Sequence, residues 1–133
     1  MLLTIDIGNT SIAVGIFNQK DLNATFRIAT DRDNFPDEYG SLLLNLLRSA
    51  NIAVDEITAA VISSTVPGLT TTFQEVCEKY FQVKPVIVGA GIKTGINILY
   101  ENPKEVITAK KIQQWGAIQF VKLVLGVPVV PGR

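Results

Sequence analysis

Three short apolar runs, separated by polar turns, fill the first 29 residues and constrain the fold more than any other feature of the chain. The runs cover residues 2–7, 11–17 and 22–29. Apolar runs of this length predict β-strands, and the short turns between them predict antiparallel neighbours. The sequence therefore predicts a three-stranded meander. Four residues are expected on its buried face: Ile5, Ile7, Val14 and Ile16.

Two amphipathic stripes follow the meander and predict helices. The first starts at Pro36, whose fixed φ suits a first helical turn. Its apolar members are Tyr39, Leu42, Leu43, Leu46, Leu47 and Ala50. The second starts after Pro67 and Gly68, which we expect to break the chain. Its members are Leu69, Phe73, Val76, Cys77 and Tyr80.

Short β-type runs alternate with these helices. Residues 57–63 and 86–88 are expected to be strands, residues 96–100 are either strand or extended loop, and residues 104–124 are expected to be helical. The predicted order β-β-β-α-β-α-β indicates an α/β fold with helices packed on a mixed sheet. Together with the first turn, this order is that of a ribonuclease H-like domain.

Composition excludes several classes of function. Twelve Lys and Arg balance twelve Asp and Glu, so a basic nucleic-acid-binding surface is not expected. The absence of His removes His-based triads and His-ligated metals. The single Cys77 excludes an internal disulfide, which fits the reducing cytoplasm, and it is expected to fill the core. No apolar stretch reaches the ~18–20 residues of a membrane helix.

The segment from Asp6 to Ser11 is the candidate for chemistry. A carboxylate ends one predicted strand, and Gly8 allows the close backbone approach that a ligand in a tight turn needs. Successive turn N–H groups can bind an anion, and Asp6 would reach a phosphate through Mg²⁺ or water. The arrangement suits the β- and γ-phosphates of a nucleotide. An ordinary β-hairpin with an Asx turn is the alternative.

An ordered set of motifs over the first hundred residues resembles the type III pantothenate kinases, of the actin-like superfamily of acetate and sugar kinases. The set comprises IDIGNTSIAVGIF (5–17), Arg27-Ile28, Thr30-Asp31, Asp37-Glu38-Tyr39-Gly40, Ile62-Ser63-Ser64, Val66-Pro67, Tyr80-Phe81, Lys93-Thr94-Gly95, Tyr100-Glu101-Asn102-Pro103 and Glu105-Val106. The first motif alone is shared by related kinases and chaperones. The ordered set is specific.

The resemblance implies ATP-dependent phosphorylation of pantothenate to 4'-phosphopantothenate, the first step of coenzyme A biosynthesis. It implies Mg²⁺ with ATP, a monovalent cation (K⁺ or NH₄⁺), and cytoplasmic homodimers with two ribonuclease H-like domains per subunit. The implied phosphate loop is Asp6, Ile7, Gly8, Asn9, Thr10, Ser11, Ile12 and Ala13, with Asp6 acting on the magnesium of MgATP. The implied substrate positions are Tyr100, Ile107, Thr108, Ala109 and Lys110.

The chain departs from the family pattern after Val106. The family has Gly-Ala-Asp-Arg there, and its Asp is the general base. Ala109 occupies the base position and Lys110 the Arg position. Alanine accepts no proton, and a lost base typically costs ~10²–10⁴-fold in rate. The family's second phosphate loop, whose Asp holds the monovalent cation, follows a strand that matches Val129-Val130, and here residues 131–133 end the sequence.

These departures lead to an expected organisation. Residues 1–103 form the first ribonuclease H-like domain, and residues 104–133 begin a divergent, truncated second domain. We expect little or no kinase activity from this chain alone, and restoring the Asp alone is not expected to rescue it. The alternatives are a non-enzymatic, pseudokinase-like or regulatory subunit that pairs with an intact homologue, and a truncated remnant.

Overall fold

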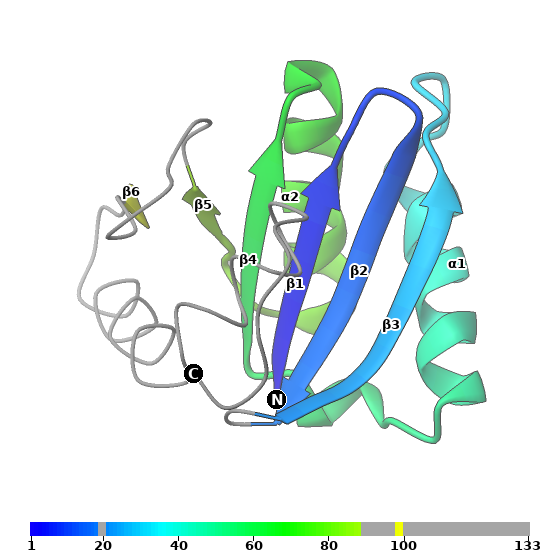
Figure 1. The fold of residues 1–133 in the computed structure, drawn as a ribbon, viewed down its shortest axis with the longest axis vertical. Helices are drawn as coiled ribbons and strands as arrows, with labels where there is room; N and C mark the ends of the chain where they lie inside the picture. The colour runs from blue at the N-terminus through cyan, green and yellow to red at the C-terminus, as the bar shows by residue number, and fades with distance from the viewer. Residues whose placement is uncertain (19–20, 89–97, 100–133) are drawn as a thin grey trace, which may run out of the picture.

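The computed structural model describes residues 1–18, 21–88 and 98–99. In this part of the chain the elements are β1 (Leu2–Ile7), β2 (Ser11–Asn18), β3 (Asp21–Ala29), α1 (Pro36–Ser49), the short 3₁₀ helix η1 (Val54–Glu56), β4 (Ala59–Ser64), α2 (Pro67–Phe81), β5 (Val86–Val88) and β6 (Ile98–Leu99). The described strands form one sheet with the order β3-β2-β1-β4-β5-β6 (Figure 1).

The sheet is mixed, as the sequence predicts. β1, β2 and β3 form the expected antiparallel meander, with a register irregularity at Ile16/Phe17. β4 then joins β1 in parallel, β5 joins β4 in parallel, and β6 pairs antiparallel with β5. β1 therefore lies between an antiparallel neighbour and a parallel one, so the residues at its end are central in the sheet.

Both long helices lie on the same face of the sheet (Figure 1). Alternate strand residues point toward them and build the core, because successive side chains of a strand point to opposite faces. All four residues that we expect on the buried face belong to this core and have no exposed surface: Ile5, Ile7, Val14 and Ile16. The packing of the meander against α1 and α2 therefore follows from alternation that is visible in the sequence.

Helix α1 begins where the sequence predicts. Pro36 occupies the first turn, and the Glu38 carboxylate accepts a hydrogen bond from the Phe35 N–H at 2.8 Å. One prediction for its stripe is wrong, because Leu42 is 37% exposed, whereas Tyr39, Leu43 and Leu47 are buried. The predicted stripe is wider than the face of α1 that contacts the sheet and α2.

Helix α2 differs from its prediction at its start. Pro67 and Gly68 do not break the chain but form the first turn of α2, since Pro lacks only an N–H that a first turn leaves unpaired. The helix ends at Phe81, and the next residue, Gln82, has a left-handed φ of 51°, which is typical of the residue after a helix. Cys77 is fully buried in the core, as predicted.

The strand expected at 57–63 spans Ala59–Ser64 instead. Ile57 follows η1 and is buried outside the strand, so its apolar character reports core packing rather than strand pairing. The short strand Val86–Val88 is confirmed, and β6 confirms part of the 96–100 prediction. The helix expected at 104–124 and the domain boundary at 103/104 lie outside the described residues.

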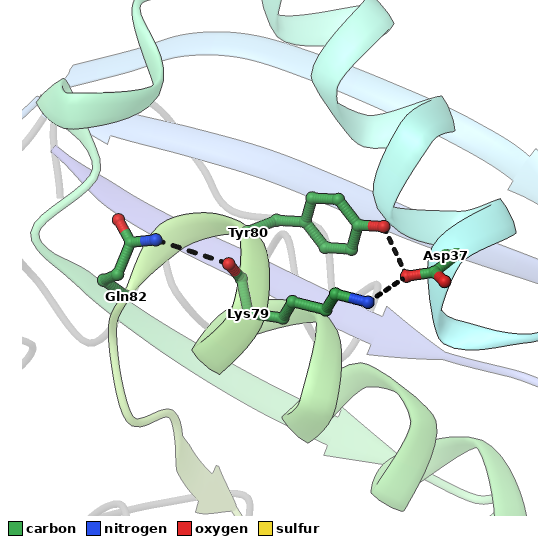
Figure 2. Close-up of polar contacts among 4 residues, drawn as sticks. All are labelled: Asp37, Lys79, Tyr80 and Gln82. Atoms are coloured by element: carbon green, nitrogen blue, oxygen red, sulfur yellow. Dashed lines mark hydrogen bonds and ion pairs between the residues drawn. The ribbon is translucent and has the colours of Figure 1, made fainter.

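Polar contacts join the two helices at their solvent edge (Figure 2). Lys79 Nζ lies 2.8 Å from Asp37 Oδ1, and the Tyr80 hydroxyl donates a hydrogen bond to the same oxygen. Gln82 Nε2 donates to the Lys79 carbonyl at 3.3 Å. The two contacts with Asp37 connect the first turn of α1 to the last turn of α2.

In the part of the chain that the structure describes, none of the helices could span a lipid bilayer.

Candidate functional site

Asp6 is the second-last residue of β1 and lies in one row that crosses the sheet. The register pairs Asp6 with Ala13 on β2 and with Ser63 on β4, and it pairs Ala13 with Arg27 on β3. Paired residues point to the same face of a sheet. The row therefore places a carboxylate between two small side chains, with a guanidinium group two strands away. This face is opposite to the one that the helices cover.

The turn between β1 and β2 exposes backbone donors beside Asp6. The Gly8 N–H donates to the Ser11 carbonyl at 3.0 Å. Asn9 and Thr10 at the tip of the turn are exposed. Within the described residues, no group accepts a hydrogen bond from their backbone N–H groups. A Cβ at position 8 would lie 3.0 Å from the Ser11 carbonyl oxygen, so Gly8 allows this close backbone approach. Free N–H groups in a tight turn suit an anion.

The end of β3 and the residues after it hold this turn from one side. The Thr30 hydroxyl donates to the Gly8 carbonyl at 2.7 Å, and the Thr30 N–H donates to the Thr10 carbonyl at 3.1 Å. These two bonds fix the backbone on both sides of Asn9. The turn is therefore held by tertiary contacts in addition to its own hairpin.

Two arginines contact side chains of the same turn. Arg27 Nη1 donates to the Ser11 hydroxyl at 2.9 Å, and Arg32 Nη2 donates to Asn9 Oδ1 at 2.9 Å. Both arginines are exposed. They bring two positive charges to an otherwise neutral turn, and guanidinium groups match phosphate oxygens in charge and geometry.

The end of β4 holds the other side of the turn. The Thr65 N–H donates to the Ile7 carbonyl at 3.0 Å. The Ser64 hydroxyl instead makes a local turn, accepting from the Val66 N–H at 2.9 Å and donating to the Val66 carbonyl at 3.0 Å. Ser64 is therefore engaged in the start of α2 and is not arranged as a nucleophile.

The Asp6 carboxyl group is half-buried, and no group within the described residues donates a hydrogen bond to it. Desolvation raises the pKa of Asp6 to about 6, and the nearby positive charge of Arg27 opposes this rise. A desolvated carboxylate without a donor fits a hydrated Mg²⁺, which is often bound by one or two carboxylates together with phosphate oxygens. The described residues contain no group of three or more acidic or Cys side chains that could hold a metal alone.

The predicted phosphate loop spans the end of β1, the turn and the start of β2. Asp6, Gly8, Asn9, Thr10 and Ser11 surround the tip of the turn, whereas the side chains of Ile7 and Ile12 are buried in the core and cannot contact a ligand there. The Ala13 side chain lies beside Asp6. The predicted substrate positions (Tyr100, Ile107, Thr108, Ala109 and Lys110) lie outside the described residues.

No single motif in the sequence indicates the contacts that three residues make with the turn: Arg27, Thr30 and Arg32. Arg27 and Thr30 belong to the resembling motifs, but their contacts with the turn depend on strand register. For Arg27 the signal is incomplete: the first hairpin pairs residue 6 with residue 13, but counting back from the second turn places residue 26 opposite residue 13. The register irregularity at Ile16/Phe17 is what brings Arg27 to that position. For Arg32 the sequence held no such signal.

The fold is similar to that of a ROK hexokinase from Thermus thermophilus, with a TM-score of 0.52 at 14% sequence identity. The match covers 66% of this chain and 34% of the hexokinase chain, so this chain spans about a third of that protein's length. At this identity the similarity shows the fold alone. It confirms the predicted α/β, actin-like ATPase fold.

The sequence pattern of one family covers nearly all of the chain. The pattern that defines type III pantothenate kinases matches residues 2–122, which include every described element. This match confirms the resemblance that the ordered motifs indicate. The name of this family describes phosphotransferases. The chain belongs to the type III pantothenate kinase family.

Proposed function

We propose that this chain binds MgATP at the turn after β1 and belongs to a kinase that transfers the γ-phosphoryl group to pantothenate. One observation supports the proposal most. The half-buried Asp6 carboxyl lies beside a turn whose tip carries free N–H groups and two arginine contacts. The name of the family supports pantothenate as the acceptor, with 4'-phosphopantothenate as the product.

In this proposal the turn binds phosphate oxygens through backbone donors. The N–H groups of Asn9 and Thr10 donate to a terminal phosphate, and Arg27 and Arg32 supply positive charge from the β3 side. When bound, Mg²⁺ neutralises charge on the phosphates and orients them for in-line transfer. Asp6 holds the hydrated ion. Binding requires the ionised carboxylate, so the positive charge of the metal favours deprotonation of Asp6.

The acceptor side of the reaction is proposed from the family alone. Tyr100 and residues 107–110 occupy its substrate positions, and Ala109 occupies the position of its general base. We therefore propose little or no turnover by this chain alone, since a positioned base typically contributes ~10²–10⁴-fold to the rate. A monovalent cation and a homodimer belong to the same proposal.

The test has a binding arm and a turnover arm. The purified chain is titrated with MgATP by calorimetry, and phosphorylation of labelled pantothenate is followed with Mg²⁺ and K⁺ present. We expect saturable binding that Asp6→Asn weakens by about tenfold or more, since it removes the charge that holds the metal. Gly68→Ala serves as a matched control, because the open space around Gly68 accepts a methyl group. Absence of nucleotide binding to the wild-type chain would contradict the proposal.

A second candidate is a nucleotide-binding subunit without catalysis, and Ala109 with Lys110 at the base and Arg positions favours it. In this case the chain binds MgATP, shows no turnover, and forms a stable heterodimer with an intact homologue on co-expression. Turnover above the blank would exclude this candidate. Recovery of monomer or aggregate alone would count against the pairing.

A further inference from the structure

Tyr39 on α1 makes an unusual pair of contacts with the residues that follow β3. Its hydroxyl donates to the Asp31 carbonyl at 2.8 Å and accepts from the Asp31 N–H at 2.8 Å. One side chain therefore forms hydrogen bonds with both the backbone N–H and the backbone carbonyl of a single loop residue. The Tyr39 ring is fully buried and lies against the Phe73 ring, with centroids 4.6 Å apart. The hydroxyl thus projects from a rigid part of the core.

Asp31 accepts hydrogen bonds from two residues of its own loop. Its carboxylate accepts from the Asp33 N–H at 2.9 Å, and its carbonyl also accepts from the Asn34 N–H at 3.2 Å. The backbone before α1 therefore turns around Asp31, and the Tyr39 hydroxyl fixes where that turn lies relative to the core.

The two neighbours of Asp31 are the residues that hold the β1–β2 turn. Thr30 bonds to the carbonyls of Gly8 and Thr10, and Arg32 bonds to the Asn9 side chain. A series of hydrogen bonds, joined by the backbone on either side of Asp31, thus links the Tyr39 hydroxyl to the tip of the turn. Removing the hydroxyl removes both bonds that it makes with Asp31.

We propose that Tyr39 is a positioning residue for phosphate binding: it sets the geometry of the β1–β2 turn through Asp31, Thr30 and Arg32 and touches no ligand itself. The ligand is a phosphate group of a nucleotide, and this part of the proposal rests on the proposed function. The core packing of the ring is separate from this role, since only the hydroxyl contacts Asp31. Tyr39→Phe keeps the ring and removes the hydroxyl, so it separates the two.

The test measures amide hydrogen exchange in the β1–β2 turn and the Kd for MgATP. Amide hydrogen exchange is followed by NMR in the full chain for Gly8 and Thr30, which donate to turn carbonyls, and for β4, which reports global opening. We expect Tyr39→Phe to speed exchange at Gly8 and Thr30 relative to β4 by about tenfold, the effect of losing one well-formed hydrogen bond. The Kd for MgATP rises by a similar factor.

Two control variants distinguish positioning from general stability. Tyr80→Phe also removes one tyrosine hydroxyl, but that hydroxyl bonds to Asp37 at the solvent edge of the helix pair. Leu47→Val weakens the core at the far end of α1 and keeps every hydrogen bond of the series. We expect both controls to leave the Kd and the exchange ratio within about twofold of wild type, because neither touches Asp31.

The outcomes separate this inference from the proposed function. If Tyr39→Phe changes neither the exchange ratio nor the Kd, or if Leu47→Val changes them equally, Tyr39 is not a positioning residue. If the wild-type chain binds no MgATP, the proposed function fails, and the exchange ratio alone then decides whether Tyr39 sets the turn.

Discussion

Gly40 on α1 faces the ring of Tyr80 on α2 so closely that a Cβ at position 40 would lie 2.3 Å from Tyr80 Cε2. The missing side chain is therefore what allows the ring to lie across α1. From this position the Tyr80 hydroxyl reaches Asp37, one turn earlier on the same helix. The place of the Tyr80 ring against α1, and its hydrogen bond to Asp37, therefore depend on this one glycine.

Gly40→Ala is expected to destabilise the protein by about 1–3 kcal/mol, because the added methyl group displaces the Tyr80 ring and breaks its bond to Asp37. Urea unfolding measures the change. Gly68→Ala is the matched control: nothing lies within 4 Å of its added methyl group, and we expect it to be neutral or stabilising. In a Tyr80→Ala background the cost of Gly40→Ala should disappear, and a cost that persists would contradict the contact.

Asp6 and Asp37 are expected to give opposite pH dependences of stability. Burial raises the pKa of Asp6 from 3.8 to about 6. The folded protein therefore binds more protons at this site than the unfolded chain, and this contribution to stability falls as the pH rises from about 4 to 6. Hydrogen bonds from Lys79 and Tyr80 lower the pKa of Asp37, so its contribution is present at neutral pH and is lost as the pH falls below 4.

We would measure the free energy of unfolding of wild type, Asp6→Asn and Asp37→Asn across pH 3–8. The difference between wild type and each variant then gives the sign of the pH dependence that each carboxyl group contributes. Asp6→Asn should gain stability relative to wild type as the pH rises through the window. Asp37→Asn should be less stable than wild type at neutral pH, and this difference should disappear at acid pH. Salt should also reduce the difference, because the ion pair between Asp37 and Lys79 is exposed. Two difference curves of the same sign would contradict this assignment.

Arg27→Gln is expected to raise the pKa of Asp6 further, because the Arg27 charge opposes the effect of burial. Carboxyl ¹³C titration by NMR measures this pKa directly. The variant also removes the donor to the Ser11 hydroxyl, so nucleotide binding should weaken in parallel. Arg48→Gln, in the last turn of α1, provides a charge-matched control that should leave Asp6 unchanged. If the pKa of Asp6 does not change in Arg27→Gln, the electrostatic coupling between these two residues is refuted.

Cys77 is expected to resist thiol reagents in the folded protein. It is fully buried, and desolvation raises the pKa of its thiol to about 12, so little reactive thiolate exists near neutral pH. Labelling with a disulfide reagent should be slow in buffer and complete in denaturant. Because reaction then requires opening of the structure, the logarithm of its rate should rise in Gly40→Ala in proportion to the lost free energy of unfolding. Rapid labelling of the native wild type would contradict the burial of this residue.

Much of the fold was predictable because its signals are local. Alternating apolar residues placed Ile5, Ile7 and Val14 in the core, and helical spacing with Pro36 located α1. The prediction for the start of α2 is wrong, since Pro and Gly next to each other suit both a break and a first helical turn. The prediction for Leu42 is wrong because periodicity gives the direction of an apolar stripe but not the width of the contact that covers it.

In the candidate site, too, the local features are visible in the sequence and the long-range contacts are not. The carboxylate, the tight turn and the small residues around it are visible in the sequence, because they are neighbours along the chain and share one hairpin. Three contacts become visible only in the folded chain: Arg27 lies in the row of Asp6, Thr30 holds the turn, and Tyr39 bonds to Asp31. Such contacts depend on strand register and on where a helix docks. Both are set by the packing of the whole core, which no local pattern of residues contains.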